Sequence, residues 1–183
     1  MRKSLLLFAA IFVFTTLNAQ RPTIEKNLYG IQLGIIDLSA YNEYRLTSTL
    51  ALKCELSFES GIWSGSWYTE AGFVIFPTIS LEPKFYYNLD RRVDKGRNIK
   101  NNSANYLSLR IKYAPDLFAI SNQDNVYILN QIQFIPTYGI RRNFAKQFNY
   151  EISFGYGYGT TIGYNYNTTT DILAIGLRVG YDF

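Results

Sequence analysis

The chain has 183 residues, of which 48% are hydrophobic, with 18 basic and 14 acidic side chains. This length suits a single domain, and the small net charge of +4 gives no case for a nucleic acid partner. Cys54 is the single cysteine, which excludes an intramolecular disulfide, and the absence of histidine excludes histidine-dependent catalysis.

The first 19 residues have the pattern of a cleavable export signal. Arg2 and Lys3 form a basic start, Leu5 to Leu17 an apolar run, and Asn18-Ala19 a small-residue ending. The apolar run is too short for a membrane-spanning helix, which needs about 20 residues. We therefore expect residues 1–19 to be removed, which reduces the net charge to +2.

The amino-terminal part of the mature chain alternates between apolar and polar residues in two different phases. The first phase places Tyr29, Ile31, Leu33 and Ile35 on one face, and the second places Leu38, Ala40, Tyr44 and Leu46 there. We expect two strands joined by a short turn near residues 36–37. One long strand with a bulge is the alternative.

Four further segments show the same period of two, with charged residues on the opposite face. Their apolar positions are Leu50, Leu52, Leu56 and Phe58; Phe73, Ile75, Ile79, Leu81, Phe85 and Tyr87; Leu107, Leu109, Ile111 and Tyr113; and Ile128, Ile132, Phe134, Tyr138 and Ile140. Cys54 has the apolar parity and is expected to face lipid. Pro77, Pro83, Pro115 and Pro136 each lack a backbone donor, so we expect them at bulges or strand ends.

The last two segments are the clearest strands. Large apolar residues from Phe148 to Tyr158 alternate with a polar and glycine-rich face that includes Gly155, Gly157 and Gly159, and the same alternation runs from Leu173 to Phe183. A strand of about 9–11 residues crosses a bilayer at a tilt, with lipid on one side and a polar lumen on the other. The glycines are expected to make room for bulky lumen groups or to allow sharp curvature.

Together these segments predict an all-β fold, an eight-stranded antiparallel up-and-down transmembrane β-barrel that occupies residues 20–183 as one domain. Counting residues 27–46 as one strand would give seven strands. An even count is usual for bacterial barrels, and an open sheet would expose unpaired backbone groups to lipid.

With Phe183 in the periplasm, each connection is assigned to one side of the membrane. Residues 61–70, 119–125 and 160–170 lie outside, and residues 47–49, 88–103 and 142–146 lie in the periplasm. The connection from Asp90 to Ser103 contains five basic and two acidic residues and is long for a periplasmic turn. We expect a solvated polar loop, with a specific binding arm as the alternative.

The carboxy-terminal residues Leu177-Arg178-Val179-Gly180-Tyr181-Asp182-Phe183, with the signal ending Asn18-Ala19-Gln20 and the alternating strands, resemble the small outer-membrane β-barrel proteins of the OmpA and OmpX type. The resemblance covers nearly the whole mature chain and implies a place in the Gram-negative cell envelope. It implies that the barrel-assembly machinery reads Leu177, Val179, Tyr181 and Phe183, and that outer-membrane lipid surrounds the barrel. The long Asp90–Ser103 connection departs from the family's short turns.

Charged side chains with the inward parity predict a lumen filled by ion pairs. The expected network comprises Glu43, Arg45, Lys53, Glu55, Glu82, Lys84, Arg110, Lys112, Arg141, Glu151, Arg178 and Asp182. A turn at residues 47–49 sets Glu43 opposite Lys53, so these two are expected to form a cross-strand ion pair. Unpaired charges in a narrow barrel would be costly to desolvate.

Three functional hypotheses remain at this level. The leading one is a structural or interaction barrel that is not an enzyme and uses no cofactor, with an unidentified surface partner. Its rivals are a narrow channel or small-ligand binder with its site near Gly155–Gly159, and an enzyme using Glu55, Glu59, Glu82 or Glu151. Related barrel enzymes generally use histidine, which is absent here. Trp63, Trp67 and Tyr68 are expected to form an interfacial aromatic belt, with a ligand-stacking platform as the alternative.

Overall fold

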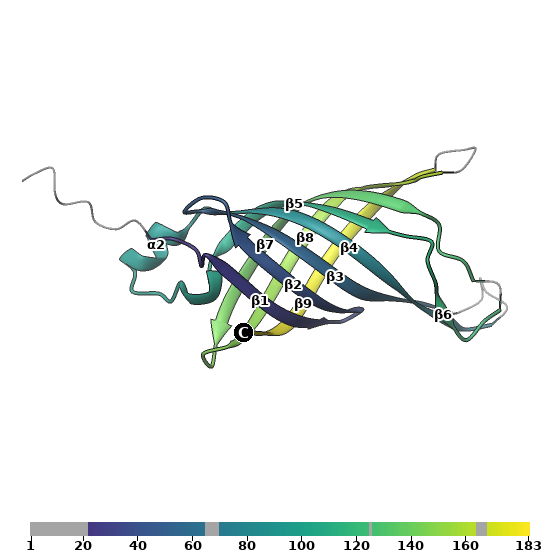
Figure 1. Cartoon of the computed structure of the whole chain (residues 1–183), viewed down its shortest axis with the longest axis horizontal. Helices are drawn as coiled ribbons and strands as arrows, with labels where there is room; N and C mark the ends of the chain where they lie inside the picture. Colours follow the sequence, from purple (N-terminus) through teal and green to yellow (C-terminus); the bar gives the residue numbers. More distant parts are fainter. Residues whose placement is uncertain (1–21, 65–69, 125, 164–167) are drawn as a thin grey trace, which may run out of the picture.

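The computed structural model describes residues 22–64, 70–124, 126–163 and 168–183 and is a closed, eight-stranded antiparallel β-barrel (Figure 1). The long strands are β1 Asn27–Gly34, β2 Asp37–Arg45, β3 Leu50–Trp63, β4 Gly72–Tyr86, β5 Asn105–Ala114, β7 Gln131–Phe144, β8 Phe148–Thr161 and β9 Thr169–Asp182. Neighbours along the chain pair with each other, and β1 pairs with β9 to close the barrel. The short strand β6 (Ile120–Ser121) pairs with β4 beyond the end of β5. The expected signal, residues 1–19, lies outside the described residues.

The phase change near Ile35 is a hairpin. β1 and β2 pair antiparallel with Leu33 opposite Leu38, which leaves residues 35 and 36 as the turn. The predicted split is confirmed, and the single bulged strand is wrong. Each strand buries its own inward face, which is why the alternation restarts in the opposite phase after the turn.

Outward and inward faces differ sharply in chemistry. Apolar side chains cover the outside, where Leu33 is 65% and Ile175 is 66% exposed. Inward positions are mostly polar or small, and the Lys53 side chain is fully buried. Cys54 is exposed on the outward face, as expected. This pattern is the reverse of a soluble barrel, whose core is apolar.

Three of the four prolines lie inside strands, so the expectation of bulges or strand ends is wrong for them. Pro83 lies inside β4 opposite Leu52, and Pro136 lies inside β7 opposite Leu109, with the register of both ladders unchanged. Pro77 faces the gap between β5 and β6, where β4 has no partner on that side. A proline lacks one backbone N–H, so it loses a hydrogen bond to only one of the two neighbouring strands. No extra residue has to be inserted to accommodate it. Pro115 follows the end of β5, as predicted.

Glycines of β8 make room for a lumen side chain. A Cβ atom built on Gly155 would lie 2.7 Å from Cγ2 of Ile135, whereas one built on Gly157 would meet the backbone carbonyl of Phe134. Ile135 is 1% exposed and fills the lumen at this level. Of the two expected roles for the glycines, the first is therefore observed at Gly155, while Gly157 allows the β7 backbone to approach closely.

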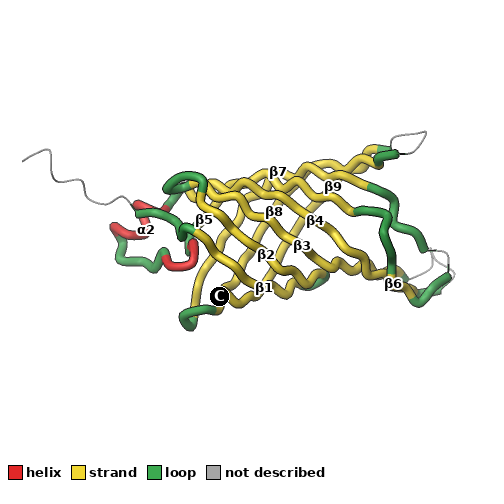
Figure 2. Tube along the Cα trace, in the orientation of Figure 1, coloured by secondary structure: helices red, strands yellow, loops and turns green. Residues whose placement is uncertain are grey.

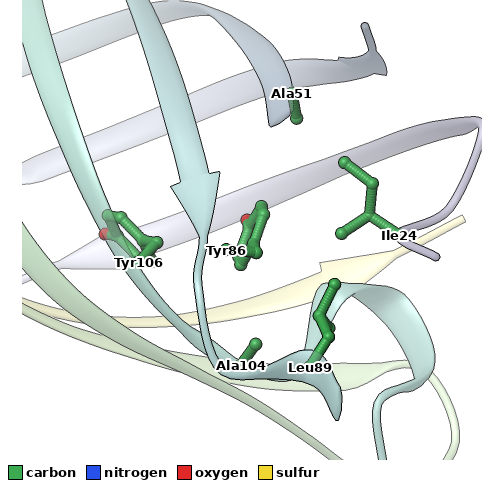
Figure 3. Packing of buried hydrophobic residues seen from close by; sticks show 6 residues of the cluster. All are labelled: Ile24, Ala51, Tyr86, Leu89, Ala104 and Tyr106. Atoms are coloured by element: carbon green, nitrogen blue, oxygen red, sulfur yellow. The ribbon is translucent and has the colours of Figure 1, made fainter. Parts of the chain in front are cut away.

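One end of the barrel is closed by a cap, the connection between β4 and β5 (residues 87–104). This connection contains α2 (Leu89–Asp94) and the 3-10 helix η1 (Lys100–Asn102), and both lie at the end of the barrel near the carboxyl terminus (Figure 2). A small apolar cluster packs beneath it, formed by Ile24, Ala51, Tyr86, Leu89, Ala104 and Tyr106 (Figure 3). The expectation of a solvated loop is wrong for its buried part, because Leu89, Asn101, Asn102 and Ser103 are shielded from solvent. No helix within the described ranges is long and apolar enough to cross a membrane.

Candidate functional site

Next to the cap, the lumen contains ion pairs that join four strands. Lys84 Nζ on β4 lies 3.1 Å from Glu151 Oε1 on β8, and Arg141 on β7 lies 3.3 Å from the other Glu151 oxygen. Arg141 also lies 2.6 Å from Asp182 Oδ1 on β9. These side chains are essentially fully buried, and the pairing offsets the high cost of removing charges from water.

A second group of charges lines the wall formed by β2, β3 and β9. Glu55 Oε2 lies 2.5 Å from Lys53 Nζ and 3.1 Å from Arg178 Nη1. Arg178 reaches Asp37 at 3.0 Å on its other side. Asp37 was not among the predicted network residues, because the sequence places it next to the β1–β2 turn, where the direction of its side chain is not determined by parity alone.

Two further pairs lie on the side of the lumen opposite the cap. Arg110 Nε lies 3.3 Å from Glu82, whose other oxygen accepts a hydrogen bond from the Ser108 hydroxyl. Lys112 Nζ lies 2.6 Å from Glu59 Oε1. Glu59 is a second network residue missing from the prediction, although its inward parity was a usable signal.

Buried tyrosines extend the network and were missed from the sequence. Tyr86 donates to Glu43 and Tyr106 donates to Glu151, each at 2.6 Å, while the Tyr41 hydroxyl contacts Asp182. The ring of Tyr106 also lies 4.0 Å from Lys84 Nζ. Their inward parity was the available signal, since most other strand aromatics face outward.

Asn101 and Asn102 close the lumen from the α2–η1 connection. The Asn101 side-chain amide donates to Asp182 at 3.0 Å, and the Asn101 backbone carbonyl accepts from Arg141 Nε at 2.9 Å. The Asn102 side-chain amide donates to Glu43 at 2.6 Å, and Asn102 Oδ1 accepts from the Glu25 backbone N–H at 2.7 Å. Both asparagines have positive φ, a conformation that asparagine tolerates better than most residues. The two asparagines thus close this end of the lumen with groups that hydrogen-bond to its charged side chains.

The predicted pair between Glu43 and Lys53 is half right. The two residues are directly opposite each other and both are buried, so the register is confirmed. They form no ion pair: Lys53 binds Glu55 and the Gln32 side chain, while Glu43 binds Tyr86 and Asn102 and lies 3.9 Å from Lys84. Side chains this long reach across the lumen as easily as sideways, so register alone does not choose the partner.

Arg45 is a correction to the predicted network. Its guanidinium donates to the Thr23 hydroxyl at 3.2 Å and to the Ile24 carbonyl at 3.0 Å. No carboxylate of the described residues lies within ion-pair distance of it. Arg45 therefore fastens the segment before β1 to the barrel end, and the other predicted network residues lie in the lumen.

The end of the lumen opposite the cap is an open cup with both polar and apolar residues in its wall. Two adjoining cavities of about 370 and 340 Å³ share Glu59, Lys112, Gln131, Gln133 and Thr170 in their walls. The Gly155–Gly159 face, where a ligand was expected, does not line either cavity. Glu59 and Lys112, the two charged residues of the shared wall, form an ion pair with each other.

The remaining predicted positions fall in different places. Trp63 has the inward parity of Glu59, and its ring lies against Gly72. Its place in an interfacial aromatic belt stays a prediction. Trp67 and Tyr68 lie outside the described residues. Leu177 and Val179 are exposed on the outward face, and Tyr181 makes edge contacts with Phe148 and Phe183.

Each carboxylate that the enzyme hypothesis named is engaged by a cation: Glu55, Glu59, Glu82 and Glu151. Within the part of the chain that the structure describes, no group of three or more acidic or cysteine side chains could hold a metal ion. Comparison with family models, curated proteins and solved structures gives no match.

Proposed function

We propose that this protein is a small integral outer-membrane β-barrel of the OmpA/OmpX-like kind, with a structural or interaction role, that neither conducts solutes nor catalyses a reaction. The observation that carries the proposal is the combination of an apolar outside with a lumen closed by ion pairs. Lys84, Arg141 and Glu151 fill the lumen next to the cap, and Asn101 and Asn102 close that end.

The outward surface supports a lipid environment. Strands β7, β8 and β9 have 14 residues each, which exceeds the 9–11 or so residues needed to cross a hydrocarbon core at a tilt. Their outward side chains are apolar and exposed, as at Tyr156 and Leu173. Exposed apolar area of this extent would drive aggregation in water and is stabilised in lipid.

The closed lumen argues against a channel. A water path would have to pass the fully buried side chains of Lys84, Arg141 and Glu151 and then the cap. Separating such pairs leaves uncompensated charges in a site shielded from water, at a cost of several kcal/mol. The charges therefore act as internal braces for the barrel wall.

A small-ligand binder is the second candidate, and the cup at the open end of the lumen supports it. Lys112, Gln131 and Gln133 present donors and acceptors at the open end of the lumen, and the cavities have the size of small-molecule sites. In the proposed orientation this cup opens to the cell exterior, because Phe183 and the cap lie at the opposite end.

Cysteine labelling on intact cells tests the proposed location and orientation. In a Cys54→Ala background, Asn122→Cys is expected to react with an impermeant maleimide, whereas Asn98→Cys reacts only after the outer membrane is permeabilised. The reverse result would invert the orientation. Equal labelling of both in a soluble cell fraction would overturn the membrane location itself.

A further inference from the structure

A basic pocket lies where the α2–η1 connection meets the barrel rim, outside the lumen. The cavity is about 340 Å³ and is lined by Tyr87, Asn88, Arg91, Arg92, Lys95, Arg97, Asn105 and Arg142. Five of these eight residues are cationic and none is acidic. A pocket with this lining attracts an anion, and its size exceeds that of a single phosphate group.

The five cations have no acidic partner in the part of the chain that the structure describes. Among the described residues, no carboxylate lies within ion-pair distance of any of them. Asp90 and Asp94 lie on α2 itself but do not line the pocket. This contrasts with the lumen, where Lys84, Arg110 and Arg178 each have a carboxylate partner. The charge at the rim is therefore available to a ligand.

Two of the arginines are held in position by neutral acceptors. Arg92 donates through Nε and Nη2 to the Asn98 carbonyl at 3.1 and 2.6 Å, and Arg142 donates to Asn105 Oδ1 at 2.6 Å. A guanidinium has five N–H donors, so both arginines keep donors free for a ligand. Burial, followed by the neighbouring guanidiniums of Arg142 and Arg97, lowers the pKa of Arg92. A bound anion would counteract the effect of these positive charges on that pKa.

The pocket opens beside the apolar outside of the barrel. Tyr87, Asn105 and Arg142 have the outward parity, and the Asn105 amide donates to the hydroxyls of Tyr87 and Tyr138 at 3.2 and 2.9 Å. Exposed tyrosines at the edge of an apolar band are typical of the membrane–water interface. Phosphate groups of lipids lie at that same depth.

We propose that this pocket, formed by Arg91, Arg92, Lys95, Arg97 and Arg142, is a binding site for a phosphate group, supplied by the headgroup of a phospholipid in the periplasmic leaflet. The lipid source rests on the proposed membrane function, whereas phosphate recognition rests on the pocket alone. Arginine forks match phosphate oxygens in a bidentate manner, and basic pockets beside membrane-spanning segments bind anionic headgroups. Occupation would tie the α2–η1 cap to the membrane surface.

Binding to the purified mature chain in a neutral detergent tests the proposal. The probes are inorganic phosphate, short-chain phosphatidylglycerol, and short-chain diacylglycerol as a phosphate-free control. Arg92→Gln/Arg142→Gln removes the two anchored arginines. Arg91→Gln/Lys95→Gln removes two exposed cations without a hydrogen-bonding role in the fold. Lys100→Gln/Lys146→Gln removes the same charge at the same end of the barrel, outside the pocket.

Phosphatidylglycerol is expected to bind saturably, inorganic phosphate to compete with it, and diacylglycerol not to bind. Each pocket variant is expected to weaken binding roughly tenfold or more, and the control variant less than about twofold. Tighter binding of phosphatidylglycerol than of phosphate identifies the lipid as the source, and equal binding identifies free phosphate.

Equal weakening by the Lys100/Lys146 control, or no saturable binding of either phosphate probe, would overturn the proposal. Phosphate binding by a chain that does not reach the outer membrane would keep the site and remove the membrane function. A barrel that inserts but binds neither probe would keep the function and remove the site.

Discussion

Lys84 on β4 and Glu151 on β8 meet across the lumen at 3.1 Å, although β5 and β7 lie between their strands. Glu151 also accepts from Arg141 and from the Tyr106 hydroxyl. One carboxylate thus neutralises two buried cations on different walls of the cylinder. Cross-lumen contacts of this kind brace a barrel whose interior contains few apolar side chains.

Glu151→Gln is expected to lower the free energy of unfolding by about 3–5 kcal/mol, because Lys84 and Arg141 lose a shared counter-charge in a buried site. Denaturant unfolding of the protein folded in lipid vesicles, followed by tryptophan fluorescence, measures the change. Asp171→Asn, at an exposed position of β9, is the matched control and should change stability by less than about 0.5 kcal/mol. Equal effects of the two variants would show that this network adds no stability.

The pair between Arg110 and Glu82 is expected to behave as a coupled unit. Arg110→Met leaves Glu82 with the Ser108 hydroxyl as a neutral donor, so this single variant is strongly destabilised. Arg110→Met/Glu82→Leu removes both charges and is expected to recover at least about 1 kcal/mol relative to Arg110→Met. A double-mutant cycle on unfolding free energies supplies the measurement, and strict additivity would contradict the pairing.

Asn102 is expected to contribute through both its hydrogen bonds and its backbone conformation. Its φ of 58° suits glycine and asparagine, and its side chain bridges Glu43 and the Glu25 backbone. Asn102→Gly loses only the bridge, whereas Asn102→Ala also has to adopt a left-handed conformation, which costs about 1 kcal/mol more. Denaturation midpoints should therefore fall in the order asparagine, glycine, alanine. A glycine variant as stable as the natural protein would show that the cap bridge is dispensable.

Phe183 is expected to matter more for assembly than for stability. It is 72% exposed, and its ring contacts that of Tyr181. Deleting Phe183 should reduce the folded barrel recovered from cells several-fold while leaving the stability of purified protein within about 1 kcal/mol. Leu46→Ala, an exposed apolar position at the same barrel end, is the control and should leave the yield unchanged. Parallel losses of yield in both variants would contradict a specific assembly signal.

Local alternation predicted most of the barrel wall. The period of two at β8 and β9, the phase change at Ile35, and the Glu43–Lys53 register all depend on neighbouring residues in one or two strands. These features follow from the rule that one face of each strand is apolar and the other polar.

Partner choice inside the lumen was not predictable in the same way. Lys53 selects Glu55 and Gln32 over the directly opposite Glu43, because long side chains on a curved wall reach partners on several strands. The closure of the lumen by the cap was not predictable for a different reason. Asn101 and Asn102 lie in a strongly polar connection, and only the folded path of that connection brings them to the end of the lumen.

Single-channel recording in a planar lipid bilayer tests the closed lumen most directly. The purified protein without residues 1–19 is expected to show no discrete conductance steps, because in the proposed closed lumen Lys84, Arg141, Glu151 and the Asn101–Asn102 cap interrupt any water path. Reproducible steps whose size changes on Glu82→Gln or Arg110→Gln would contradict the closed lumen and favour a channel.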